Sequence, residues 1–454
     1  MDASATDARL DDPQVFLPDL FAAHARSDPG RDAVVCGDRR LSWGAFDEAQ
    51  NRVANALLSL GLAKGDKVAL LLGNAVETPA LIYGAVRAGA CVVPLSGLLT
   101  AEQVGGLIAD SGARFAVMTG AFREAGEAAR PAAPAVERWL AAGFEGAGWE
   151  SFDALMAAAA TTHPPVRHAM TDAFNIIYSS GTTGLPKGIV QTHRARTHWA
   201  FSNASEMGFA ADCRALTTTA LYSNGTWLMM LPALFAGGTL QVMPSFDGAA
   251  FLRTVEAERI THTFMVPAQI IMTLERPELP AADLSSLQAV LSGGSPLRRD
   301  TKREAMARIS PRLFELYGYS EGFATMLRPD QHAAKFETVG TPVLGFEIVV
   351  LREDGTEAAP GEPGEIAGYG AGIMAGYHGR PEATEEIVWR DRLGRTFLRS
   401  GDIGSLDEDG CLVILDRKKD MIISGGFNVF PSDVEEIVGA HPDVGDVTVI
   451  GVPH

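Results

Sequence analysis

Short runs of apolar residues alternate with longer stretches of helical spacing along most of the chain. Residues 67–73 (KVALLLG) predict a buried strand, residues 77–89 a helix and residues 91–96 the next strand. Strand–helix–strand repetition is typical of parallel sheets with helices on both faces, so the pattern predicts an α/β fold. The same alternation returns later, with strands expected at 239–244, 263–267, 287–291 and 313–317 and helices at 249–258 and 298–309.

The alternation changes at three places. Residues 121–165 are rich in Ala, Pro and Gly, and we interpret them as a surface excursion between two sheet-containing lobes. From residue 337 the runs become shorter and are punctuated by Gly, which predicts a small distorted β-barrel. A charged junction, DRKKD at 416–420, follows, and the residues after it are too few to enclose a core. We therefore expect a large N-terminal domain at 1–418 and, at 419–454, the start of a small α+β C-terminal domain.

Composition and charge exclude several classes of protein. The 454 residues carry 38 Lys and Arg against 56 Asp and Glu, a net charge of −18, which argues against a nucleic-acid binder. The cysteines form no CxxC pair, so neither a disulfide scaffold nor a zinc site is expected. Residues 1–13 lack the pattern of a signal peptide. The uncharged stretch 215–246 contains Pro232 and many hydroxyls, which favours buried core over a membrane span. A soluble, cytoplasmic protein is expected.

A glycine- and hydroxyl-rich loop, YSSGTTGLPKG at 178–188, is the strongest local signal. Glycines let the backbone approach a ligand closely, and several hydroxyl donors beside a lysine suit phosphate oxygens. A solvated surface turn needs no such set of side chains, and the spacing does not fit the GxxxxGK[ST] P-loop. The candidate phosphate-binding residues are Ser179, Ser180, Gly181, Thr182, Thr183, Gly184 and Lys187.

This loop resembles the phosphate-binding signature of the adenylate-forming superfamily, which includes fatty-acyl-CoA and 4-coumarate-type ligases, luciferases and the adenylation domains of peptide synthetases. The resemblance continues in order through nearly all of the chain. YGYSEG at 317–322 is similar to the family's YGxTE element, with Ser320 in place of Thr. The resemblance implies that Tyr317 stacks on adenine, Ser320 binds the α-phosphate and Glu321 holds Mg²⁺, a cation that prefers oxygen ligands. The catalytic residues that it implies are Thr182, Lys187, Ser320 and Glu321.

Further segments extend the resemblance toward the C-terminus. SGGSPL at 292–297 is similar to the segment that lines the adenine pocket and the acyl tunnel. Asp402 matches the acid that binds the ribose hydroxyls, and Arg417 a residue that bonds ribose and phosphate. SGGFNVF at 424–430 resembles the loop that contacts the pantetheine arm of CoA. The resemblance thus adds Gly293, Gly318, Asp402 and Arg417 to the nucleotide site, Lys419 as the interdomain hinge, and Gly425 and Gly426 as CoA contacts.

Two departures from the family concern the acid pocket and a catalytic lysine. The family's pocket histidine is absent from 220–227, where Ser223 or Asn224 takes its place. The family's adenylation lysine lies late in the C-terminal domain, and no lysine follows Lys419, so we expect a truncated chain that is weakly active or inactive. No Asp lies between 214 and 246, which disfavours an amino-acid substrate. The expected acyl-pocket residues are Tyr222, Ser223, Trp227, Ala268, Gly294, Tyr319 and Gly340.

The function implied by the resemblance is that of an ATP-dependent carboxylate–CoA ligase. It would use ATP, Mg²⁺ and CoA to form an acyl-adenylate and then an acyl-CoA thioester, and a homodimer is left open. Aryl and medium-to-long-chain aliphatic acids are both open, and bulky Tyr319 favours aryl or medium-chain acids. Two alternatives stay open. GYSEG at 318–322 also matches the nucleophile elbow of α/β-hydrolase esterases, with Ser320 as nucleophile. Otherwise the chain is a non-catalytic nucleotide-binding remnant.

Overall fold

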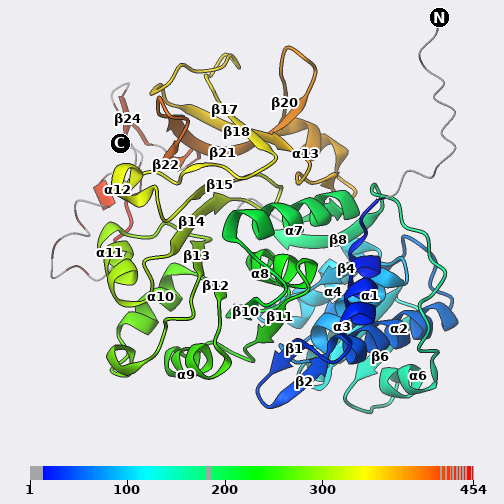
Figure 1. Ribbon diagram of the computed structural model, residues 1–454. Helices are drawn as coiled ribbons and strands as arrows, with labels where there is room; N and C mark the ends of the chain where they lie inside the picture. Colours follow the sequence, from blue (N-terminus) through cyan, green and yellow to red (C-terminus); the bar gives the residue numbers. More distant parts are fainter. Residues whose placement is uncertain are drawn as a thin grey trace, which may run out of the picture.

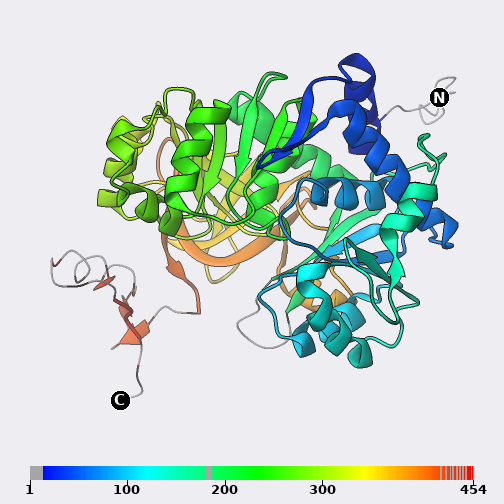
Figure 2. The same ribbon diagram turned by 90° about the horizontal axis from the view of Figure 1, so that it is seen from below.

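The computed structural model describes residues 14–179 and 186–419, together with short stretches between 422 and 452 (Figure 1). In these residues the strands form two large sheets, one smaller sheet and an isolated strand pair. Helices cover the large sheets, and the smaller sheet lies across one end of them (Figures 1 and 2). The predicted α/β class is therefore confirmed, with two sheet-containing lobes and a small curled sheet.

The first large sheet has nine described strands, and its central strands are parallel. Its order is β16-β15-β14-β13-β12-β10-β11-β1-β2, with antiparallel strands at both edges. Helices connect the parallel strands, as the alternating pattern predicts. The strand bounds are β1 Asp32–Cys36, β2 Arg39–Ser42, β10 Arg214–Thr217, β11 Thr239–Val242, β12 His262–Met265, β13 Ala289–Gly293, β14 Leu313–Gly318, β15 Ala324–Leu327 and β16 Thr341–Pro342. The helices around it include α8 Asn224–Phe235, α9 Gly248–Glu258, α10 Pro267–Leu274 and α11 Arg299–Arg308.

The second large sheet has eight described strands in the order β19-β9-β8-β4-β3-β5-β6-β7. Strands β9 and β19 are antiparallel to their neighbours, and the others run parallel. The strand bounds are β3 Lys67–Leu71, β4 Cys91–Pro94, β5 Phe115–Thr119, β6 Arg138–Ala142, β7 Glu150–Ser151, β8 Ala173–Ser179, β9 Lys187–Thr192 and β19 Gly376–Tyr377. Its helices include α2 Trp43–Ser59, α3 Thr78–Arg87, α4 Ala101–Ser111, α5 Arg123–Ala129 and α6 Phe152–Ala158.

The expectation of a surface excursion at 121–165 is wrong. This segment supplies β6 and β7 to the second sheet, and β6 pairs in parallel with β5. Leu140 and Phe152 from the segment are fully buried. Its many alanines hide the strand, because small side chains give little hydrophobic contrast even where the backbone is in the middle of a core.

Local signals in the sequence account for several helix ends. Thr100 and Gln103 form a capping box at the start of α4, and Gly112 ends that helix in the left-handed conformation with φ +66°. The helix α7 His193–Met207 begins with Thr192, whose hydroxyl accepts from the Ala195 N–H. It ends at Gly208 with φ +71°.

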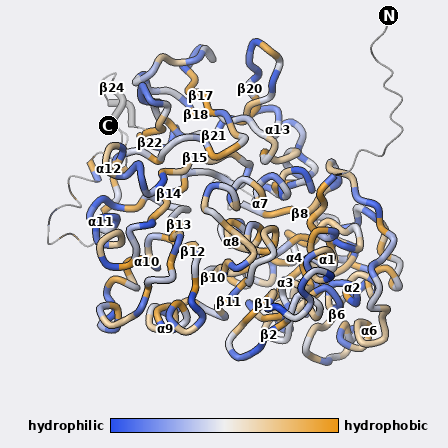
Figure 3. Tube along the Cα trace, viewed as in Figure 1, coloured by the Kyte–Doolittle hydropathy of each residue, from blue (hydrophilic) through white to orange (hydrophobic). Residues whose placement is uncertain are grey.

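One continuous hydrophobic core joins the two large sheets. It includes Val68 and Val92 from the second sheet and Leu240 and Leu291 from the first. Helices α7 and α8 pack against each other between the sheets (Figure 1). The uncharged stretch at 215–246 forms the mostly buried α8 and its flanking strands. Within the described residues, no helix combines the length and apolar character needed to cross a bilayer. Figure 3 shows hydrophobic positions along the inner strands and hydrophilic positions at the β1–β2 hairpin and α11.

The third sheet is antiparallel and built from the Gly-punctuated strands expected after residue 337. Its path is β17-β18-β21-β20, with β22 paired to β21. The bounds are β17 Phe346–Leu351, β18 Gly364–Gly370, β20 Val388–Arg390, β21 Thr396–Leu406 and β22 Leu412–Arg417. Beyond it, β23 Ile422–Ser424 pairs with β24 Phe427–Val429.

Candidate active site

The glycine- and hydroxyl-rich loop connects two antiparallel strands of the second sheet. Ser179 ends β8 and lies opposite Lys187, the first residue of β9. The side chain of Lys187 lies over the ring of Tyr377, with Nζ 4.8 Å from the ring centroid. The hairpin therefore delivers one cation at the base of the predicted phosphate loop. The predicted residues Ser180, Gly181, Thr182, Thr183 and Gly184 lie outside the described residues.

The second predicted motif occupies the tight turn between β14 and β15. The Tyr377 hydroxyl donates to Glu321 Oε1 at 2.7 Å, and the Met374 N–H donates to the Glu321 carbonyl at 2.7 Å. Gln191 Nε2 donates to the Ser320 carbonyl at 2.9 Å. The turn is thus held by β9 and by the segment that leads into β19. Tyr377 brings Lys187 and Glu321 together although they are far apart in sequence, and our sequence analysis did not anticipate it.

The carboxyl group of Glu321 is mostly buried. Burial raises its pKa above the usual value, and the Tyr377 hydrogen bond and the Lys187 charge act in the opposite direction. A carboxylate in this setting is stabilised by a cation. Among the described residues, no group of three or more His, Cys, Asp or Glu side chains could enclose a metal ion. Mg²⁺ at Glu321 would therefore take most of its ligands from substrate phosphates and water, which is its usual mode of binding.

The predicted ribose site also assembles from separate elements. The Tyr317 hydroxyl, at the end of β14, donates to Asp402 Oδ2 at 2.7 Å. Asp402 on β21 is the register partner of Arg417 on β22, and Arg417 Nε lies 3.9 Å from Asp402 Oδ1. The Asp402 N–H donates to Ser400 Oγ at 3.0 Å. One carboxylate is therefore fixed between the first large sheet and the small sheet.

Two predicted nucleotide-site glycines lie in close backbone packing. A Cβ on Gly318 would lie 2.8 Å from the Phe323 carbonyl oxygen, and one on Gly293 would lie 3.0 Å from that of Leu316. Gly293 ends β13 and Gly318 ends β14, which are neighbouring strands of the first sheet. Lys419, the predicted hinge, follows β22 and is exposed, whereas Gly425 and Gly426 lie outside the described residues.

A cavity of about 150 Å³ lies beside the Ser320 turn. Of the predicted acyl-pocket residues, Trp227, Gly294 and Tyr319 line it. Gly318 and Ser320 also reach its wall. Asn224, which the sequence suggests as a replacement for the family's pocket histidine, also lines it. The lining residues that the sequence did not reveal are Arg196, Trp199, Gly225, Leu228, Leu231, Phe264, Leu316, Phe323 and Ala324.

The structure places the other predicted pocket residues elsewhere. Tyr222 lines a separate, very small cavity, and Ser223 is the residue before α8. Ala268 is exposed on α10. Gly340 has φ +75° and packs against the backbone of β15, while its carbonyl accepts from the Leu412 N–H at 2.8 Å. Gly340 is therefore positioned for strand packing and does not line the cavity.

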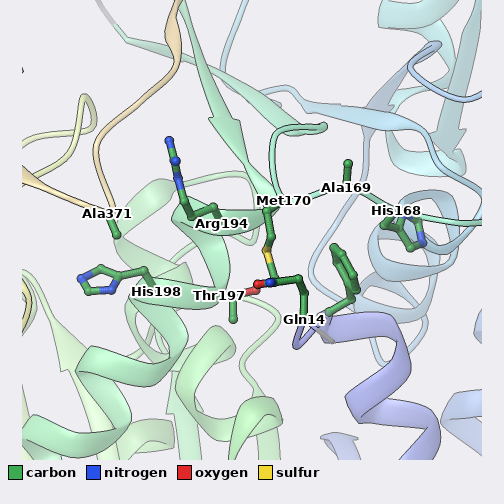
Figure 4. A pocket seen from close by; sticks show the side chains of 9 residues that line it. Gln14, His168, Ala169, Met170, Arg194, Thr197, His198 and Ala371 are labelled. Atoms are coloured by element: carbon green, nitrogen blue, oxygen red, sulfur yellow. The ribbon is translucent and has the colours of Figure 1, made fainter. Parts of the chain in front are cut away.

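A second hollow, of about 570 Å³, lies on the other side of α7 (Figure 4). Arg194, Thr197 and His198 reach it from α7, and His168 faces it from the preceding segment. We assign it no substrate, because its wall includes Gln14, the first residue that the structure describes.

The geometry at Ser320 does not match an esterase. A nucleophile elbow is a strand, a sharp turn and then a helix. Here β14 is followed by the antiparallel strand β15, so the motif lies in a strand–turn–strand unit. The GAGIMA segment at 370–375 matches the GxGxxA pattern of dinucleotide-binding turns, but it leads from β18 to β19 and not into a helix.

Two α/β lobes joined to a small curled sheet, with the Lys187–Tyr377–Glu321 and Tyr317–Asp402–Arg417 groups at the two ends of the turn 318–320, define an adenylate-forming enzyme. The chain belongs to the family of AMP-binding enzymes, whose model matches residues 21–378.

Its relatives include acyl-CoA and aryl-CoA ligases. A feruloyl-CoA synthase of Amycolatopsis sp. is 34% identical over 432 residues, which cover 94% of this chain and 84% of that protein. The long-chain-fatty-acid–CoA ligase FadD13 of Mycobacterium tuberculosis is 32% identical over 425 residues, which cover 92% of this chain and 81% of that protein. The structure of ATP-bound MatB from Rhodopseudomonas palustris matches with a TM-score of 0.87 and 29% identity, covering 97% of this chain and 86% of that one.

Proposed function

We propose that the protein activates a small carboxylic acid with ATP and transfers the acyl group to CoA. In the first step a carboxylate oxygen attacks the α-phosphorus and pyrophosphate leaves. In the second, the CoA thiol loses its proton, its sulfur attacks the acyl carbon, and AMP leaves. The observation that carries the proposal is that the Tyr317–Asp402 pair and the Lys187–Tyr377–Glu321 group lie at the two ends of the turn 318–320, whose residues line the cavity.

Each of these groups has a role in positioning the nucleotide. We assign Asp402 and Arg417 to the ribose, with the Tyr317 ring against adenine. Lys187, with the loop residues Thr182 and Thr183, would bind the departing phosphates, and the Ser320 hydroxyl would bind the α-phosphate. Glu321 would hold Mg²⁺, which supplies charge neutralisation to the triphosphate when it is bound. Catalysis of this kind consists mainly of positioning and charge stabilisation.

The size and lining of the cavity support a compact acid. An engineered apolar cavity of about 150 Å³ holds one benzene molecule, and this cavity is about 150 Å³. Trp199, Trp227 and Phe264 contribute aromatic surface to it. We therefore place aryl acids and short-to-medium aliphatic acids ahead of long-chain fatty acids.

We assign the later contacts to the C-terminal part of the chain. Gly425 and Gly426 would approach the pantetheine arm of CoA, and rotation about Lys419 would exchange the adenylation and thioester-forming arrangements. Lys419 is exposed two residues after the end of β22, where the third sheet ends, which is compatible with a hinge.

The test measures pyrophosphate release and acyl-CoA formation with ATP, Mg²⁺ and CoA across a panel of acids. Benzoate, cinnamate, octanoate and palmitate sample the range, and mass spectrometry identifies the acyl-adenylate. AMP binding is measured alongside by calorimetry, because binding does not depend on turnover. We expect acid-dependent release that falls at least roughly 10-fold in Asp402→Asn, because a charged hydrogen-bond acceptor is lost. ATP-independent ester hydrolysis abolished by Ser320→Ala would contradict the proposal.

A further inference from the structure

Arg196 is a buried cation in the wall of the cavity of about 150 Å³ beside the Ser320 turn. It lies on α7, is 2% exposed and lines the cavity together with Asn224 and Trp227. Its Nε donates to Asn175 Oδ1 at 2.7 Å, and its Nη1 donates to Asn224 Oδ1 at 2.9 Å. The guanidinium carbon lies 4.5 Å from the centroid of the Trp227 ring. The protein therefore holds this guanidinium in one orientation at the cavity.

The charge of Arg196 is not balanced by the protein around it. Within 14–179 and 186–419, no Asp or Glu forms an ion pair with Arg196, and both hydrogen-bond partners are neutral amides. Burial lowers the pKa of Arg196 to about 9, which leaves it protonated at neutral pH. A buried cation without an anion is costly, and the π face of Trp227 offsets only part of that cost.

Three buried donors, on Arg196 and on two residues that interact with it, lack hydrogen-bond acceptors in the described part of the chain. Arg196 Nη2 has no hydrogen-bond partner in the described part of the chain, and neither has Asn175 Nδ2. The buried hydroxyl of Tyr83, which interacts electrostatically with Arg196, also has none. Of the five N–H donors of an arginine, only two are bound by amide oxygens here. The remaining donors are on Nη1 and Nη2, the pair of nitrogens that can bind a carboxylate through two parallel hydrogen bonds. Nη2 is itself buried, so its neighbours would have to shift slightly to admit a carboxylate oxygen.

We propose that Arg196 binds a second carboxylate on the substrate, so that the acid activated by this protein is a compact dicarboxylic acid. This inference rests on the proposed function. One carboxylate would reach the Ser320 turn and the nucleotide, and the other would pair with Arg196 in a different part of the cavity wall. The small volume of the cavity limits the spacer between the two carboxylates to a short chain or a single ring.

The test compares diacids with monoacids of matched shape. The pairs are glutarate with pentanoate and terephthalate with 4-methylbenzoate, and calorimetry with AMP present measures binding independently of turnover. We expect each diacid to bind the wild-type protein at least roughly 10-fold more tightly than its monoacid, because the monoacid leaves the buried donors unpaired. The proposal would be overturned if both diacids bound the wild-type protein no more tightly than their matched monoacids.

Variants at two arginines of α7 identify the group responsible. Arg196→Met should weaken diacid binding roughly 10- to 100-fold and leave monoacid binding nearly unchanged. Arg196→Lys keeps the charge without the two parallel donors, so its diacid affinity should lie between those of wild type and Arg196→Met. Arg194→Met is the matched control, since Arg194 is exposed on the same helix, and it should bind like wild type. Arg196→Met should also raise the Tm, because it removes an unpaired buried charge. An equal loss for diacids and monoacids would assign Arg196 a structural role only.

The two proposals fail in different ways. Diacids that bind through Arg196 while AMP does not bind and no acid gives an adenylate would overturn the ligase and leave the diacid site standing. Adenylate formed from monoacids alone would leave the ligase standing and overturn the diacid site.

Discussion

At the scale of single residues, Glu321 is proposed to bind Mg²⁺ as a carboxylate, while burial of that charged carboxylate lowers the stability of the fold. Burial raises its pKa in the folded state above the usual value of 4.5. The protonated Glu321 carboxyl therefore contributes stability that is fully present below pH 4.5 and is lost as the pH rises through its folded-state pKa. Above its folded-state pKa the protein carries a desolvated carboxylate at Glu321, which ATP and its cation would stabilise.

Replacing Glu321 by Gln tests this account. The amide keeps a carbonyl oxygen for the Tyr377 hydroxyl and removes the charge, so the Tm at pH 7.5 should rise while pyrophosphate release falls roughly 100-fold or more. Scanning calorimetry between pH 4 and 8 should show the gain in Tm shrinking as the pH falls toward 4.5, the usual pKa of this carboxyl. A Tm for Glu321→Gln below that of wild type at neutral pH would show instead that the carboxylate stabilises the turn.

At the scale of elements, Gly340 links the first large sheet to the third. Its φ of +75° favours glycine, and a Cβ at this position would overlap the Met326 carbonyl on β15. Gly340→Ala should therefore reduce the free energy of unfolding by roughly 2–3 kcal/mol. Gly106→Ala is the control, since Gly106 is exposed inside α4 with no atom near the added Cβ, and it should stabilise by about 0.5–1 kcal/mol. Urea unfolding measures both variants, and equal effects would contradict this role for Gly340.

Strong hydrophobic contrast made the parallel strands and their helices predictable from the sequence. Strands such as β3 and β12 are short apolar runs that end in turn residues, and the structure places them within one or two residues of the expected positions. Strand β6 was missed because its buried alanines have little contrast. The motif residues Tyr317, Glu321 and Asp402 were found through a resemblance, while their shared contacts depend on tertiary structure.

The missed site residues explain the limit of sequence reasoning at this scale. Helix α7 has polar residues on several sides, so its periodicity does not show that Arg196 is buried and Arg194 exposed. Tyr377 lies in a strand of two residues, β19, whose position is fixed only by pairing with β9. Neither side chain carries a local signal for its contacts.

At the scale of the whole molecule, the ribose site lies where two sheets meet. Tyr317 belongs to the first large sheet and Asp402 and Arg417 to the third, so a bound nucleotide would join the two. AMP at 100 times its Kd should add about 2.7 kcal/mol to the free energy of unfolding. Hydrogen exchange should slow most in β14, β21 and β22, as measured by mass spectrometry. Protection confined to the second sheet would place the nucleotide elsewhere.

Tyr377 also affects how the two charges of the site respond to their ligands. Lys187 lies on the face of its ring and Glu321 on its hydroxyl, and in the described part of the chain these two charges form no direct ion pair. A direct pair would have to break before either partner could take a ligand. Held apart by a neutral ring, the ammonium stays ready for phosphate and the carboxylate for a cation, and each ligand lowers the electrostatic cost of admitting the other. The Lys187 charge still lowers the pKa of Glu321 across the ring, so the two sites remain electrostatically coupled, and the nucleotide phosphates and their cation should bind cooperatively.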